Sequence, residues 1–467
     1  MLALFNDLST QRRDLKESLE ETPLLQAGLL LLIGCGASTF PWLLLLAPLI
    51  ASYRIALLAP VGWLAAFFTA QAPLTEPIHG DAYISIERFT YERSHFGRSY
   101  CYTAKLRALG ESGPRRVRIH TKRHIYPASR DYIIPNARLT PSMRLTSKEV
   151  WRPVPSTFSL AEWRFQLKRR IKKEIRMRVP GEAGNIMSAL ATGDIDSIPV
   201  RFHFAKLGLS HLLALSGFHF ALLATLLTIV TRRSYRTVLT LLLLYALYIG
   251  PSPSVSRAHI AITLFLIAKG LFYRQPPLNA LGGALLIALI IDPHITSSIA
   301  FQLSFGATLG ILLLYRPCCD FLTRLIPRHP HEIAIQMPLL DQHAIFILWY
   351  VRKSYALLFA VYLVIAPLLL YHFGEIPLLT LLYSPLITPL VSLLFVLVLI
   401  PPVWRVGGIV AQGLWEVIVN APRAYAYTVG TPMLEPWMVA LWCSGISLYG
   451  LWRAAMRNRQ ISCVPLM

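Results

Sequence analysis

Length, composition and charge already define the broad class of protein. The chain has 467 residues, of which 55% are hydrophobic and only 15% are charged, whereas about 25% of the residues in a typical soluble domain are charged. Its 45 Lys and Arg against 24 Asp and Glu give a net charge of +21. These values exclude a single water-soluble core, a disordered chain and a coiled coil. They predict a polytopic α-helical membrane protein with a strongly basic aqueous part.

The N-terminal part has a charged segment followed by an apolar one. Residues 1–23 mix acidic and basic side chains without the order of a removable signal peptide, so we expect an amphipathic arm that the mature protein keeps. Residues 24–70 are almost uncharged. Because a membrane span needs about 20 apolar residues, this block forms either two transmembrane helices or three short ones.

Residues 71–157 have a different texture. Polar and apolar residues alternate at 82–87, 100–108 and 116–120, with a turn signal at 111–114. Period-two segments separated by turns predict a small inserted antiparallel β domain with one wet face. We expect this domain outside the bilayer, because open strands cannot face lipid.

Residues 158–203 predict a basic amphipathic helix and a connector. Trp163, Leu167, Ile171 and Ile175 recur at every fourth position and form an apolar stripe. The basic residues around it include Lys168, Arg169, Arg170, Lys172 and Lys173. Such a helix suits a membrane surface.

Residues 204–452 predict a multi-pass transmembrane domain. Its candidate spans are residues 211–230, 236–249, 258–272, 278–291, 297–315, 355–373, 376–400, 407–419 and 436–451. Residues 316–353 are a mixed stretch with Pro327, Pro330 and Pro338, and they predict an interfacial connector. Residues 453–467 form a basic tail, which the positive-inside rule places in the cytoplasm.

The excess charge admits two interpretations. Residues 71–183 hold more than twice as many basic as acidic residues. Those in and next to the β segments include Arg115, Arg116, Arg118, Lys122 and Arg123. A cationic face could rest on anionic lipid headgroups, which composition alone favours, or bind a polyanion such as nucleic acid. Interleaved aromatic residues such as Tyr102 and Tyr132 would suit base stacking, but they are equally ordinary residues of a β core.

Polar side chains also interrupt the apolar segments. A projection at about 100° per residue places His211, Ser216 and His219 on one side of an otherwise apolar helix. Titratable groups at membrane depth are costly and usually face a bundle interior or a water-filled path. Alternatively, the two histidines are interfacial and bond only to the backbone. The step from Ser216 to Gly217 also allows a close helix contact or a break.

Two further polar clusters follow. Ser254 and Arg257 come directly after an irregular proline-rich segment, which is tolerated at depth only beside protein or water. Arg257 either meets a phosphate there or snorkels to an interface, and the sequence favours neither. Gln302 and Ser304 interrupt an apolar run, where hydrogen bonding between helices is the favoured interpretation.

The sequence predicts no catalytic residue, no metal site and no cofactor. His329-Pro330-His331 resembles the start of a zinc-hydrolase motif, but Asp and His do not follow at the required places. No phosphate-binding Gly-rich loop is present, and the six Cys show no paired spacing. We therefore do not expect an enzyme.

Three motifs occur in a consistent order. Gly193-Asp194 is followed by His-Leu-Leu-Ala-Leu-Ser-Gly-Phe-His at residues 211–219, then by Pro-Ser-Val-Ser-Arg-Ala at 253–258 and Phe-Gln-Leu-Ser-Phe at 301–305. Together they resemble the motifs of the ComEC competence-protein family of DNA-uptake channels. The resemblance covers residues 24 to 400 approximately, and it is weaker before residue 180.

This resemblance implies an OB-like domain at residues 71–157, outside the cytoplasmic (inner) membrane of a bacterium. It implies that the chain passes single-stranded DNA inward during natural transformation. The residues that it assigns to a transmembrane DNA path are Asp194, His211, Ser216, Gly217, His219, Ser254, Arg257, Gln302 and Ser304. The basic residues of the β domain and of the following helix would contact DNA.

The sequence departs from the many family members that end in a metallo-β-lactamase-like domain. We therefore expect a separate nuclease, together with a separate DNA receptor and an ATP-driven motor protein. Membrane lipids are further expected partners, and a homo-oligomer remains an option. The alternatives are a carrier for a small anionic solute or lipid, and a membrane scaffold that transports nothing.

Overall fold

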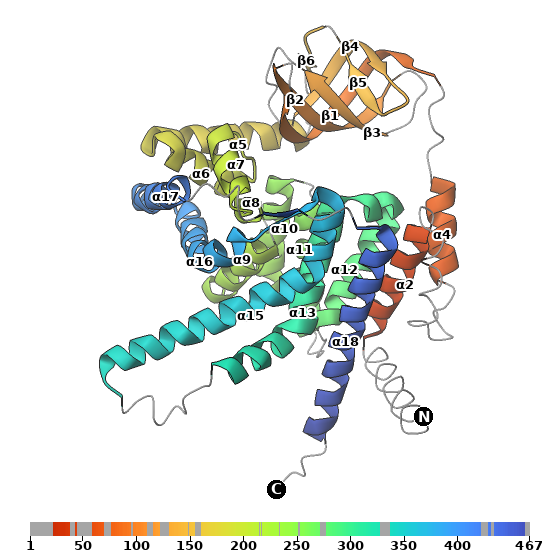
Figure 1. Ribbon diagram of the computed structural model, residues 1–467. Coiled ribbons are helices and arrows are strands. Elements are labelled where there is room, and N and C mark those ends of the chain that lie inside the picture. The colour runs from red at the N-terminus through yellow and green to blue at the C-terminus, as the bar shows by residue number, and fades with distance from the viewer. Residues whose placement is uncertain are drawn as a thin grey trace.

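The computed structural model shows a small β-barrel above a body of helices (Figure 1). It describes residues 22–37, 43, 58–69, 76–94, 97–109, 115–121, 130–147, 149–154, 160–213, 215, 217–232, 234–250, 253–270, 277–326, 337–421, 428–430 and 434–462. Nearly all of the predicted N-terminal arm lies outside the described residues, as do Lys122, Arg123 and Ser216.

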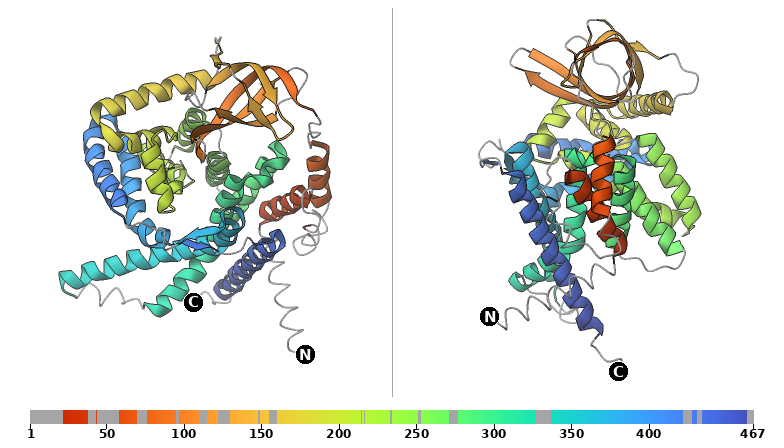
Figure 2. Two further views of the ribbon diagram at one scale, coloured as in Figure 1. Left: turned by 45° about the horizontal axis from the view of Figure 1, so that its top comes forward. Right: turned by 90° about the vertical axis from the view of Figure 1, so that its right-hand side faces the viewer.

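The barrel contains the strands predicted for residues 71–157. They are β1 (Ile78–Ser94), β2 (Gly97–Ala108), β3 (Arg115–Thr121), β4 (Asp131–Leu139), β5 (Arg144–Thr146) and β6 (Arg152–Pro153). The strand order is β1-β2-β3-β5-β4-β6, and β1 also pairs with β4, which closes a barrel of five strands. The pairing of β3 with β5 is parallel and the others are antiparallel. Figure 2 shows the closed ring in its right-hand view.

The alternating sequence pattern explains the interior of the barrel. Residues at every second position point inward, as Tyr102, Ala104 and Leu106 do on β2, and none of these three is exposed to solvent. The Trp151 ring packs edge-on against Tyr102, with ring centroids 5.2 Å apart. Two register shifts in the β1–β2 pairing let the long β1 bend. The predicted β domain is confirmed as a small barrel.

The helices fill the rest of the chain. Before the barrel lie α2 (Pro23–Ala37) and α4 (Leu58–Thr69). After it come α5 (Leu160–Arg178), α6 (Gly181–Thr192), α7 (Ile198–Lys206), α8 (Ser210–Leu213), α9 (Gly217–Val230), α10 (Tyr235–Ile249), α11 (Pro253–Gly270) and α12 (Pro277–Ile291). The C-terminal part holds η2 (Pro293–Ser297), α13 (Ile299–Leu325), α15 (Leu339–Phe373), α16 (Leu379–Val398), η3 (Pro401–Val403), α17 (Trp404–Val419) and α18 (Pro436–Ser462). Two short strands, β7 (Glu375–Pro377) and β8 (Thr428–Gly430), pair with each other.

Several helices are long and apolar enough to cross a membrane. Within the described residues, four segments meet both criteria: Ser210–Val230, Ile299–Leu325, Leu339–Phe373 and Leu379–Val398. Shorter apolar helices are Pro23–Ala37, Tyr235–Ile249, Pro277–Ile291 and Pro436–Leu451. Length and composition thus agree with the predicted class, a helical membrane protein.

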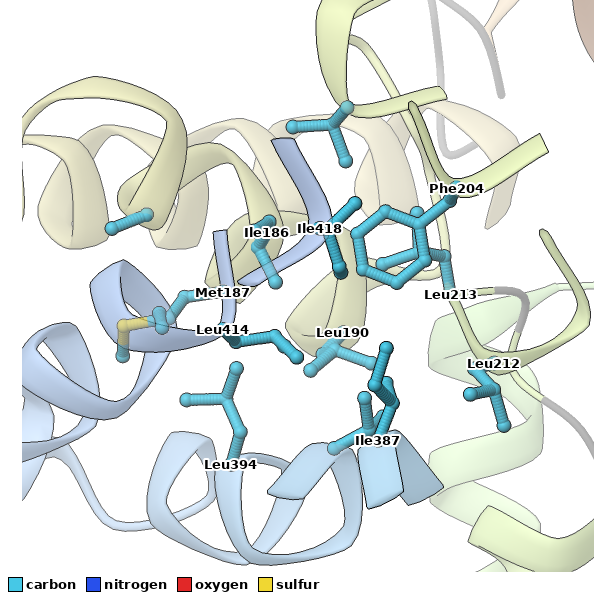
Figure 3. Packing of buried hydrophobic residues seen from close by; sticks show 14 of the residues in the cluster. Ile186, Met187, Leu190, Phe204, Leu212, Leu213, Ile387, Leu394, Leu414 and Ile418 are labelled. Carbon is cyan, nitrogen blue, oxygen red and sulfur yellow. The ribbon is translucent and has the colours of Figure 1, made fainter. Parts of the chain in front are cut away.

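One apolar core joins the segment that follows the barrel to the C-terminal helices. Figure 3 shows Met187 and Leu190 of α6 packed with Leu394 of α16 and Leu414 of α17. Phe204 of α7 is fully buried in the same cluster. Residues 158–203, predicted as a basic amphipathic helix and a connector, therefore also supply core helices that fix α5 to the membrane domain.

Two sequence predictions about helices are wrong. The connector predicted for residues 316–353 is mostly helical, because α13 continues to Leu325 and α15 already begins at Leu339. The single helix predicted to carry His211 and His219 is interrupted at Leu215, between the end of α8 at Leu213 and the start of α9 at Gly217, which is the break that the sequence had allowed as an alternative. The projection that placed the two histidines on one face therefore does not apply.

Candidate functional site

The barrel carries basic side chains on its outer surface. Val117 and Ile119 point into the core, so Arg118 between them points outward and is exposed. Arg118 of β3 lies beside Arg144 of the parallel strand β5, and Arg144 is also exposed. Lys105 of β2 is exposed on the same outer side. We call Lys105, Arg118 and Arg144 the basic barrel face.

The register of the strands gives the basic barrel face its electrostatic character. Like charges on neighbouring strands repel each other, so Arg118 and Arg144 gain nothing from their proximity unless an anion lies between them. Arg115, half-buried at the start of β3, lies at the same end of the β2–β3 pair as Lys105. Arg116 pairs with Lys105 in the register. Sequence reasoning missed Lys105 and Arg144, although their outward positions follow from the alternation.

Two aromatic residues considered for base stacking are core residues. Tyr102 is fully buried and Tyr132 is 2% exposed. Both pack edge-on against Trp151. The alternative interpretation, an ordinary β core, is therefore the correct one for these two rings.

Lys168 of α5 does not lie on the exposed surface that the sequence predicted for it. The side chain is buried, and Nζ donates hydrogen bonds to Asp194 Oδ1 at 3.0 Å and to the Ile249 carbonyl at 2.9 Å. The Ile249 carbonyl belongs to the last turn of α10, where a positive charge is favourable. Lys168 therefore fixes α5 to α10 and to the segment that follows α6.

The next basic residues of this face of α5 continue the network. Lys172 Nζ lies 3.2 Å from Asp194 Oδ2 and 2.9 Å from Asp196 Oδ2. Arg176 Nη2 lies 3.2 Å from Asp196 Oδ2. Residues spaced by four share one face of a helix, which explains why Lys168, Lys172 and Arg176 meet the same short loop. We call these five residues the α5 ion-pair cluster.

The electrostatics of Asp194 reflect this pairing. Burial raises its pKa, but the ammonium groups of Lys168 and Lys172 outweigh burial and hold the pKa below its usual range. For Lys168, burial is the largest effect and lowers the pKa, against the opposing charge of Asp194. Asp194, predicted for the DNA path, and Lys168 and Lys172, predicted for the DNA-contacting surface, thus satisfy one another.

The remaining predicted cations of α5 are free of this network. Arg169, Arg170 and Lys173 are exposed to solvent. At its N-terminal end, α5 is also tied to the barrel, because Arg130 Nε lies 2.8 Å from Glu162 Oε2. Helix α5 thus links the barrel to the membrane domain through charged contacts near both ends.

A second buried cation lies among the apolar helices. Arg257 of α11 is 7% exposed. Its Nε donates to Ser304 Oγ at 2.9 Å and its Nη1 donates to Thr308 Oγ1, both on α13. The guanidinium also lies over the Phe305 ring, 5.7 Å from the ring centroid. The structure therefore brings together Arg257 and Ser304, which were predicted from separate motifs.

The first residue of α9 completes this junction. A Cβ atom added to Gly217 would lie 2.7 Å from Arg257 Nη2, so only glycine fits without displacing the guanidinium. We call Gly217, Arg257, Ser304 and Thr308 the arginine junction. Sequence reasoning missed Thr308, although its spacing of four from Ser304 places both on one face of a helix.

The other predicted path residues lie elsewhere. His211 is exposed, with Nδ1 3.1 Å from the Gly208 carbonyl, whereas His219 is buried against the Phe395 ring. Gln302 donates to the Thr296 carbonyl at 2.8 Å, and its Oε1 lies 2.6 Å from Nε2 of His372 on α15. Ser254 is half-buried in the first turn of α11. Gln302 thus makes the contact between helices that the sequence favoured.

The fold and these charged groups define a class of protein. Apolar helices of this length cross membranes, and a barrel with a charged outer surface does not sit in lipid. These features define the class of an α-helical membrane protein with a small β-barrel.

Comparison with known proteins places the chain within this class. A family model described as "Competence protein" matches residues 190–456. The chain belongs to this family, as the resemblance of its three motifs predicted.

Individual relatives match shorter segments. "ComE operon protein 3" of Bacillus subtilis (strain 168) is 31% identical over 144 residues, which cover 29% of this chain and 19% of that protein. An "Uncharacterized protein" of Aquifex aeolicus (strain VF5) is 34% identical over 116 residues, which cover 24% of this chain and 28% of that protein. The chain thus spans less than a third of the length of either relative. No solved structure matches the chain.

Proposed function

We propose that the chain passes single-stranded DNA across the bacterial cytoplasmic membrane during natural transformation. Membership of the Competence protein family supports a role in competence. The observation that carries the more specific proposal is the basic barrel face, where Arg118 and Arg144 lie side by side on neighbouring strands. A polyanion such as a DNA backbone would relieve their repulsion and release counterions.

The topology of the barrel supports an OB-like role. An OB-fold is a five-stranded Greek-key barrel that binds oligonucleotides over its second and third strands. Here the closed strand order is β1-β2-β3-β5-β4, and β3 pairs in parallel with β5. Two residues of the basic barrel face, Lys105 and Arg118, lie on β2 and β3. This face would gather phosphates without reading the base sequence.

The orientation of the molecule fits inward transport. The barrel lies at one end of the molecule and the C-terminal turns of α18 at the other (Figure 1). Those turns hold Arg453, Arg457 and Arg459, which the positive-inside rule assigns to the cytoplasm. The barrel would then lie on the outer side, where it meets incoming DNA. The exposed Arg169, Arg170 and Lys173 of α5 would extend the cationic surface towards the membrane.

We also propose that other proteins of the uptake machinery act together with this chain. A separate DNA receptor, a nuclease and an ATP-driven motor would work with this chain, and a homo-oligomer is compatible with the same role. Within the bilayer, His211, His219, Ser254 and Gln302 would supply further polar groups along the strand's path, apart from the arginine junction.

A charge-neutralising variant of the full chain tests the proposal. We expect Lys105→Gln, Arg118→Gln and Arg144→Gln together to reduce the salt dependence of oligothymidylate binding by the detergent-solubilised protein. The slope of log K against log [salt] should become shallower by about 0.7 for each phosphate that the variant no longer neutralises. The same variant should reduce the uptake of labelled DNA by cells.

A matched variant controls for net charge alone. Lys269, Arg324 and Arg405 are exposed and lie on α11, α13 and α17, away from the barrel. Their replacement by Gln should leave both the slope and the uptake unchanged. Equal effects of the two triple variants, or no effect of the first, would instead favour a solute carrier or a scaffold.

A further inference from the structure

Arg257 carries a buried positive charge without an acidic partner among the described residues. The side chain is 7% exposed. Its contacts are the hydroxyls of Ser304 and Thr308 and the face of the Phe305 ring, all of them neutral. Burying a charge is costly unless a charge of opposite sign compensates it. The fold therefore buries the Arg257 cation, and the described part of the chain supplies no negative charge to compensate it.

The N-terminus of α9 lies beside this guanidinium. Helix α9 begins at Gly217, whose position is so close to Arg257 that an added Cβ would lie 2.7 Å from Nη2. A helix N-terminus carries a partial positive charge, so the guanidinium and the N-terminus of α9 are two positive features at one place.

The hydroxyl groups orient the guanidinium towards α9. Ser304 accepts from Nε and Thr308 accepts from Nη1, and the Thr308 hydroxyl is itself held by the Ser304 carbonyl at 3.1 Å. Nη2 remains at the first turn of α9, where it forms no hydrogen bond with a described residue. Ser304 and Thr308 are therefore positioning residues, and Gly217 provides the space.

We propose that the arginine junction binds a phosphodiester anion that contacts both the Arg257 guanidinium and the first turn of α9. Helix N-termini and a guanidinium are both strong phosphate ligands. In transporters, interrupted helices place such N-termini at anionic groups near the middle of the membrane. A phosphodiester can belong to a DNA strand or to a phospholipid. We assign it to the DNA strand, and this assignment rests on the proposed function.

The binding step can be tested with a small probe. The full chain, purified in dodecyl maltoside, which contains no phosphate, is titrated with dimethyl phosphate while its thermal unfolding midpoint is recorded. We expect a rise of the midpoint that depends on the concentration of dimethyl phosphate. Arg257→Gln should weaken the apparent affinity by about tenfold or more, as expected for the loss of a charged hydrogen bond. Arg257→Lys should retain part of it.

A glycine substitution reaches the same site without removing a charge. Gly217→Ala places a methyl group against Nη2 and should abolish the response to dimethyl phosphate. Gly413→Ala is the matched control, because nothing lies within 4 Å of a Cβ at that helical position. This pair keeps the test decisive even where Arg257→Gln fails to fold. An equal response to dimethyl phosphate in Gly217→Ala and in the native chain would overturn the proposal.

Competition identifies the source of the phosphodiester. We expect short oligothymidylate with natural linkages to displace dimethyl phosphate, and oligothymidylate with uncharged methylphosphonate linkages not to do so. Displacement by short-chain phosphatidylglycerol but not by oligothymidylate would overturn the assignment to DNA. Loss of the basic barrel face should leave the dimethyl phosphate response intact. A chain that takes no part in DNA uptake can therefore be told apart from an arginine junction that does not bind dimethyl phosphate.

Discussion

The α5 ion-pair cluster and the arginine junction both bury cations, but they compensate the charge in different ways. Lys168 has a carboxylate oxygen at 3.0 Å, whereas the described residues give Arg257 only hydroxyls and an aromatic face. The first arrangement is complete within the chain and fixes one element to another. The second is incomplete within the described residues and is suited to a negative charge from outside. Burial of a cation alone thus does not identify a functional site, because the partner decides its role.

The largest expected effect comes from breaking the complete arrangement. Asp194→Asn leaves Lys168 buried without its counter-charge, and such a loss costs about 3–5 kcal/mol of the free energy of unfolding. Denaturation of the purified chain measures this cost. The double variant with Lys168→Met removes both charges and should recover a large part of the loss. No recovery would mean that the pair is not the source of the effect.

An opposite result is expected at the arginine junction. Arg257→Met removes a cation that lacks a carboxylate partner, and the Thr308 hydroxyl keeps its bond to the Ser304 carbonyl. The free energy of unfolding should therefore change by less than about 1.5 kcal/mol, because apolar replacements of buried charged groups are often neutral or stabilising. A loss as large as that of Asp194→Asn would show that Arg257 is a structural residue like Lys168.

Low pH should weaken the α5 ion-pair cluster. Because the folded protein holds the pKa of Asp194 below its ordinary value of 3.8, the carboxylate contributes stability at higher pH. That contribution is lost as the pH falls below about 4 through the lowered pKa. The native chain should lose stability there more steeply than the Asp194→Asn, Lys168→Met double variant. Parallel pH profiles of stability for the two proteins would contradict the pairing.

The smallest effect is expected at the exposed end of the cluster. The side chains of Arg176 and Asp196 are 44% and 47% exposed, so solvent screens their attraction. Arg176→Ala should lower the free energy of unfolding by less than about 1 kcal/mol. Thermal denaturation beside Asp194→Asn provides the comparison, and similar losses in both variants would refute the ranking.

Local patterns in the sequence predicted the barrel well. Alternation at residues 100–108 placed Tyr102 and Leu106 on one face because the period of a strand is two. The closure of the barrel depends on the pairing of β1 with β4, in which Ile78 meets Leu139. No local pattern encodes that pairing. The outward arginines could be predicted one by one, but the proximity of Arg118 and Arg144 could not.

The charged sites were predictable in part. The sequence placed Lys168 and Lys172 among the basic residues around the apolar stripe of one helix, but their partner Asp194 lies outside that helix, so they were interpreted as free. The shared face of His211 and His219 was predicted for one continuous helix, although the step from Ser216 to Gly217 already allowed a break. Arg257 and Ser304 were each recognised as unusual in apolar segments. Only the packing of α11 against α13 shows that they form one site.

The uptake of labelled DNA by cells that produce Arg257 variants tests the central claim most directly. The native chain, Arg257→Lys and Arg257→Met are compared at equal abundance in the membrane. The account predicts that Arg257→Met abolishes uptake and that Arg257→Lys retains part of it, because a positive charge at the junction is required. Uptake by Arg257→Met at the native rate would contradict the account.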